Sequence, residues 1–74
     1  MKTIDYTLCE KKSAEVIVAE LKDIVAERRE HGYIGFILHI KYDFPYDKEY
    51  SDNLVREIVE SKVLGEQPYI TTSS

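Results

Sequence analysis

Cys9 and His39 are of the residue types that act as a nucleophile and its base. If neighbouring strands placed them within hydrogen-bond reach, the imidazole could take the thiol proton and the thiolate could attack a carbonyl carbon. That chemistry also needs a group that orients the histidine and donors that hold an oxyanion. No pattern in the sequence marks either of these. We therefore expect His39 to be a surface residue and the protein to be no enzyme, with no catalytic residues.

Glu27 and His31 lie one helical turn apart and have side chains that bind metals. Two ligands without an evident third make a poor metal site. His31 precedes Gly32, so its simpler role is at the C-terminal end of a helix, where the helix dipole favours positive charge. The glycines at 32 and 35 lead into a strand rather than into a helix, so they form no phosphate-binding loop. We expect neither a metal nor a cofactor.

The segment YDFPYDKEYSD, residues 42–52, gives the strongest indication of a binding surface. Tyr42, Phe44 and Tyr50 fall at positions that should pack against the core. Tyr46 has no such role. The carboxylates around it are Asp43, Asp47, Glu49 and Asp52. Carboxylates can stand where phosphates would, and a tyrosine where a base would stack. The segment therefore predicts contact with the basic, nucleic-acid-binding site of another protein.

A second acidic surface is expected on the longest helical segment. Its outer face carries Glu20, Asp23, Glu27 and Glu30, at spacings of three, four and three residues. Like charges one turn apart destabilise a helix by about 0.2–0.5 kcal/mol per pair, so the stripe does not serve local stability. Solubility explains it adequately. The alternative is that it helps the segment at 42–52 to bind a partner.

Length and composition limit the function further. The chain has 74 residues, 43% of them hydrophobic, with 10 basic and 14 acidic side chains and a net charge of −4. We expect one small globular domain over residues 1–74, in which an enclosed active-site cavity would remove much of the core. A negative charge repels phosphate backbones and anionic headgroups, and the apolar runs are far shorter than the ~20 residues that span a bilayer. Direct binding to nucleic acid or to a membrane is therefore not expected.

Alternation of apolar and polar residues predicts strands at 2–8 and 33–44 and a short edge strand at 68–72, before a frayed tail at 73–74. Apolar residues at helical spacing predict two helices between these strands. The candidate starts of the first helix are a capping box of Thr7 and Glu10, and Ser13. The candidate caps of the second helix are Asp47 and Ser51. The first helix should end before Gly32 and the second at Gly65, because glycine readily takes the left-handed conformation that follows a helix.

The order β-α-β-α-β and the amphipathic strands define the fold class. Strands joined through helices usually run parallel, through right-handed crossovers. Because each strand has one apolar face, both helices should cover the same face. We predict an α/β two-layer sandwich, a three-stranded sheet with two helices packed on one face. A mixed sheet with a reversed last strand is the alternative.

The other face of this predicted sheet should be uncovered. Its residues are Thr3, Asp5, Thr7, Tyr33, Ile37, His39, Lys41 and Tyr69. Rigid aromatic anchors dominate the energies of protein interfaces. The candidate contact between copies therefore consists of Tyr33, Ile37, His39 and Lys41. The alternative function is a homodimer, or another assembly subunit, joined through this face.

In its small size, acidity and lack of motifs, the chain is similar to small proteins of phages and mobile elements that block host nucleases, such as anti-CRISPR proteins and DNA mimics. The resemblance is one of type, and it implies an inhibitor or regulator whose partner is a protein with a basic surface. The only cysteine, Cys9, cannot form an internal disulfide, and the first residues contain no apolar targeting segment. We expect a small, acidic, non-enzymatic protein-binding domain in the cytoplasm.

Overall fold

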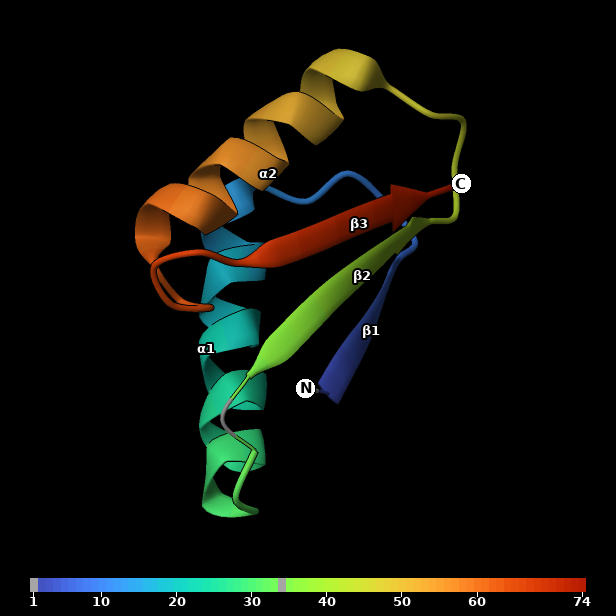
Figure 1. Ribbon diagram of the computed structural model, residues 1–74. Coiled ribbons are helices and arrows are strands. Elements are labelled where there is room, and N and C mark those ends of the chain that lie inside the picture. Colours follow the sequence, from blue (N-terminus) through green and yellow to red (C-terminus); the bar gives the residue numbers. More distant parts are fainter. Residues whose placement is uncertain (1, 34) are drawn as a thin grey trace.

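A three-stranded sheet carries both helices on one face (Figure 1), in a computed structural model that describes residues 2–33 and 35–74. The strands are β1 (Lys2–Leu8), β2 (Phe36–Tyr42) and β3 (Tyr69–Ser73), and the helices are α1 (Ala14–Glu30) and α2 (Lys48–Ser61). The predicted element order and two-layer architecture are confirmed. Ser73, predicted to belong to a frayed tail, is the last residue of β3.

All three strands run parallel, in the order β1-β2-β3. Leu38 of β2 pairs with Ile4 on one side and with Ile70 on the other. The alternative of a reversed last strand is therefore wrong. Each helix returns the chain to the start of the next strand, so the connections β1–α1 and β2–α2 both lie at the carboxyl ends of the strands (Figure 1).

The hydrophobic core lies between the sheet and the helices, as the periodicity predicts. Its buried members are Ile4, Leu8, Ile17, Leu21, Val25, Phe36, Leu38, Ile40, Tyr42, Leu54, Ile58 and Val63. The strand residues among them alternate, because successive side chains of a strand point to opposite faces. The helix residues recur at three or four positions, which places them on one side of a helix. Ile34 belongs to the segment predicted as a strand, residues 33–44, and lies outside the described residues.

Helix α1 begins at Ser13, whose hydroxyl accepts a hydrogen bond from the backbone N–H of Val16 at 3.4 Å. The capping box of Thr7 and Glu10 is wrong because Thr7 still pairs within β1. At the other end His31 is the cap, with Nδ1 2.9 Å from the carbonyl oxygen of Glu27. Gly32 follows with a φ of +86°, the left-handed conformation expected there.

Helix α2 begins at Asp47, whose carboxylate accepts a hydrogen bond from the N–H of Tyr50 at 3.1 Å. Its predicted end at Gly65 is wrong, since the helix stops at Ser61 and Lys62 takes the left-handed conformation with a φ of 59°. The early stop turns Val63 into the core, where it is only 8% exposed. Burial of this apolar side chain offsets the cost of a left-handed lysine.

Candidate functional site

Four rings from residues 42–50 form one cluster at the carboxyl end of β2. The centroid of the Tyr42 ring lies 5.4 Å from that of Phe44, 6.2 Å from that of Tyr46 and 6.4 Å from that of Tyr50. Tyr42 is buried, and Phe44 and Tyr50 pack against the core, as predicted. Tyr46 differs, because it is 53% exposed. It is therefore an aromatic side chain supported on one side and open to solvent on the other.

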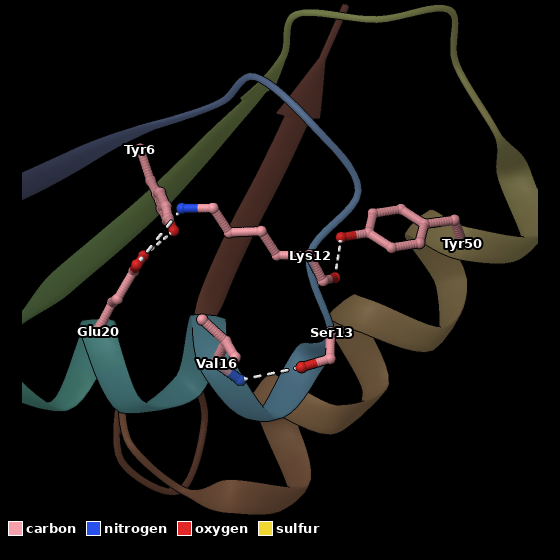
Figure 2. Close-up of polar contacts among 6 residues, drawn as sticks. All are labelled: Tyr6, Lys12, Ser13, Val16, Glu20 and Tyr50. Carbon is pink, nitrogen blue, oxygen red and sulfur yellow. Dashed lines mark hydrogen bonds and ion pairs between the residues drawn. The ribbon is translucent and has the colours of Figure 1, made fainter.

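Two hydrogen bonds of the phenol groups hold this cluster in place. The hydroxyl of Tyr42 lies 2.6 Å from that of Ser51 in the interior. The hydroxyl of Tyr50 donates to the carbonyl oxygen of Lys12 at 2.5 Å (Figure 2). The rings thus join the first turns of α2 to the connection between β1 and α1. Rings fixed in this way lose little conformational entropy when they bind a partner.

The four carboxylates of the segment have different surroundings. Asp47 pairs with Lys11, whose Nζ lies 2.8 Å from the carboxylate, and Asp52 pairs with Lys48 at 2.7 Å. The other two, Asp43 and Glu49, are exposed and form no ion pair with any described residue. Only two of the four predicted acids are therefore unpaired and open to a basic partner.

Asp47 serves the fold as well as the surface charge. The hydrogen bond from Lys11 holds the pKa of Asp47 below its ordinary value, and bonds from the backbone N–H groups of Tyr50 and Glu49 act in the same direction. Lys11 also places its ammonium 5.9 Å from the centroid of the Phe44 ring. The pairing of Lys11 with Asp47 was not predicted from the sequence, although a lysine in the connection before α1 could be expected near the carboxyl end of β2 once the strands were taken as parallel.

The four acids of the stripe on α1 also differ in their surroundings. Glu20 accepts a hydrogen bond from the hydroxyl of Tyr6, and one of its oxygens lies 3.5 Å from Nζ of Lys12 (Figure 2). The bond from Tyr6 is the largest cause that lowers the pKa of Glu20. In turn, burial raises the pKa of Tyr6, and the neighbouring carboxylate adds to the rise. The remaining acids of the stripe are exposed and without an ion pair among the described residues: Asp23, Glu27 and Glu30.

The two predicted acidic surfaces do not merge. Lys11 and Lys12 are adjacent in the chain, and each pairs with one acid of one surface, Asp47 and Glu20 respectively. A basic pair therefore stands between the surfaces at the carboxyl end of the sheet. From there α1 runs back along the strands toward their opposite ends (Figure 1), and it carries the other acids of its stripe away from the ring cluster.

The sheet face opposite the helices is uncovered within residues 2–33 and 35–74, and it is mostly polar. The register places its residues in three rows across the strands: Thr3, Ile37 and Tyr69; Asp5, His39 and Thr71; Thr7, Lys41 and Ser73. The placement of Tyr33 on this face is wrong. Tyr33 precedes β2 and packs against the core, with Nζ of Lys2 5.1 Å from its ring centroid. This leaves Ile37 and Tyr69 as the apolar part of the face.

His39 and Cys9 do not come together. The imidazole of His39 lies across β3, with Nδ1 2.7 Å from the hydroxyl of Thr71 and Nε2 3.0 Å from that of Ser73. Cys9 follows Leu8, the last residue of β1. Leu8 pairs with Tyr42, which lies three residues beyond His39 in β2. Glu27 and His31 meet only through the carbonyl oxygen of Glu27. In the described part of the chain, no three His, Cys, Asp or Glu side chains are grouped as metal ligands.

A shallow groove of about 470 Å³ separates the two helices. Its lining residues are Ala14, Glu15, Val18, Ala19, Lys22, Glu57, Glu60 and Ser61. Every buried polar side-chain atom of the described residues has a hydrogen-bond partner, so no such group is aimed into the groove at a ligand. The strand order also contains no reversal, the point at which open α/β sheets form their ligand crevices.

Comparisons with protein families, with curated proteins and with solved structures find no match to this chain. Among the helices of residues 2–33 and 35–74, none is both long and apolar enough to cross a membrane.

Proposed function

We propose that the protein is a small, non-enzymatic binding domain that docks on a basic, nucleic-acid-binding site of another protein. The observation that carries the proposal is the half-exposed ring of Tyr46, held against Tyr42, in a segment where Asp43 and Glu49 are exposed and form no ion pair with any described residue. A ring fixed on a buried support is a suitable anchor for an interface. The carboxylates of Asp43 and Glu49 would meet arginine and lysine side chains in place of phosphates.

Asp47 and Asp52 contribute less to this contact than the sequence predicts, because Lys11 and Lys48 already neutralise them. Asp23, Glu27 and Glu30 act at long range, where their charge attracts a basic partner and speeds its association. The proposed role remains that of an inhibitor or regulator in the cytoplasm, of the type found among small phage and mobile-element proteins.

Capture followed by competition tests the proposal. The protein is immobilised and exposed to a lysate of its source organism or host, and the captured proteins are eluted with double-stranded oligonucleotide. We expect the oligonucleotide to release a nucleic-acid-binding protein. A variant with Asp43→Asn, Tyr46→Ala and Glu49→Gln should not retain it.

A matched control carries Glu57→Gln and Glu60→Gln, which remove the same number of charges from the last turns of α2, outside the proposed contact. This control should retain the partner. If both variants capture the same proteins as the wild type, or if the oligonucleotide releases none, the proposed contact does not exist.

Assembly through the uncovered sheet face is not favoured. Its central row consists of Asp5, His39 and Thr71, and the imidazole already bonds to β3. A second sheet would bury these polar groups, at a cost unless each found a new partner.

A further inference from the structure

The free edge of β3 is the most neutral surface of the sheet. β3 pairs with β2 alone, so its outer N–H and C=O groups have no strand partner within the described residues. Residues 67–74 contain no charged side chain, their one proline, Pro68, precedes β3, and their tyrosine, isoleucine and threonines favour strands. Natural edge strands usually avoid pairing by charged side chains, prolines or bulges. The opposite edge has such protection, since β1 carries Lys2 and Asp5.

An apolar flank of α2 is on the same side of the molecule as this edge. Glu57 and Glu60 line the groove toward α1. At 100° per residue, Val55 and Val59 fall on the flank that faces away from α1. Val59 is 40% exposed and Val55 is half-buried. Figure 1 shows α1 behind α2 in the helix layer and β1 behind β3 in the sheet, so the free flank of α2 is on the β3 side.

We propose that two copies of the chain pair through β3 in antiparallel fashion, so that two sheets become one continuous sheet. The partner is a second copy because the edge is self-complementary. With the two-fold axis at Thr71, that residue faces its own counterpart, Ile70 faces Thr72 of the second copy, and Tyr69 faces Ser73 of the second copy. Threonine pairs and β-branched pairs are favourable across strands, and no like charges meet.

The neutral edge offers little electrostatic attraction to an acidic or a basic partner. In such a pair both α2 helices lie on the same side of the continuous sheet, with their valine flanks toward the second copy. The contact uses a five-residue strand and one helix flank from each copy, which is small for a stable interface. We therefore infer a dimer that forms as concentration rises.

Sedimentation equilibrium over a range of concentrations tests this dimer. The average mass of the wild type should rise from 8.6 kDa toward twice that value. Thr71→Lys places two ammonium groups face to face at the axis, and Val59→Lys charges the helix flank. Each should weaken association by roughly tenfold or more. Circular dichroism spectra verify that the variants remain folded.

The matched control is Thr3→Lys, which makes the same change on the same sheet face but on β1. This control should associate as the wild type does. A wild type that stays monomeric at every concentration would overturn the proposal. So would equal weakening by Thr3→Lys and Thr71→Lys, because that result places the contact on the open face instead. Asp43→Asn with Glu49→Gln should leave the dimer unchanged, which separates this inference from the proposed function.

Discussion

The hydroxyl oxygen of Tyr42 lies 2.6 Å from that of Ser51, and both side chains are buried. This contact joins the last residue of β2 to the first turns of α2 across the loop that carries Tyr46. Tyr46 is held on its inner side by the Tyr42 ring. The position of the exposed ring therefore depends on a hydrogen bond in the core.

Ser51→Ala should destabilise the protein, because it leaves the buried hydroxyl of Tyr42 without a partner. We expect the free energy of unfolding to fall by about 1–3 kcal/mol, measured by urea denaturation. Adding Tyr42→Phe removes the unsatisfied hydroxyl and should recover most of the loss. If the double variant is less stable than Ser51→Ala alone, the two hydroxyls do not act as a pair.

The stability of the protein should decrease in acid. Bonds to Lys11 and Tyr6 lower the pKa values of Asp47 and Glu20 in the folded state, from ordinary values of 3.8 and 4.5. Each carboxylate thus stabilises the fold fully above its ordinary pKa, and this contribution is lost as pH falls through the lowered value. Urea midpoints measured from neutral pH downward should show the decline.

Asp47→Asn tests whether Asp47 contributes to this loss of stability in acid, since asparagine also caps a helix but does not titrate. It should be less stable than the wild type near neutral pH and should lose less stability on acidification. Equal slopes for both proteins would show that Asp47 contributes nothing to the acid response.

Tyr6→Phe should raise the pKa of Glu20 toward its ordinary value, because the phenol bond is the largest cause of the lowering. The side-chain carbonyl shift of Glu20, followed by NMR during a pH titration, measures it directly. A Glu20 pKa that does not move in Tyr6→Phe would contradict the assignment.

Variants of Lys62 test the energetic cost of the left-handed conformation at the end of α2. Lys62→Gly and Lys62→Ala both remove the ion pair to Glu66, but only glycine relieves the left-handed conformation. We expect the glycine variant to be more stable than the alanine variant by about 1 kcal/mol in urea denaturation. An alanine variant of equal or greater stability would show that this conformation carries no cost.

The sequence predicted the elements and their packing because periodicity reports which side of each element is buried. It did not predict where α2 ends, since Gly65 is the usual signal and the gain from burying Val63 depends on the tertiary fold. Tyr33 was misplaced for a related reason. The alternation of residues 33–44 continues through Gly35, but the strand begins only at Phe36.

The residue types of the candidate site could be predicted from the sequence, but the ion pairs among its charged residues could not. The exposure of Tyr46 and the packing of Tyr42 follow from the strand pattern. The pairing of Lys11 with Asp47 joins residues that are 36 positions apart, and no local pattern contains it. Such pairs decide which carboxylates remain open to a partner. The number of open carboxylates expected from the sequence was therefore too large.

The most direct test of the proposed contact is the salt dependence of affinity for the captured partner, measured by titration calorimetry with the wild type and with Asp43→Asn, Glu49→Gln. Contacts between unlike charges weaken as salt screens them. We predict that the variant binds more weakly at low salt and loses less affinity as salt is raised. Equal affinity and equal salt dependence for the two proteins would contradict docking through Asp43, Tyr46 and Glu49.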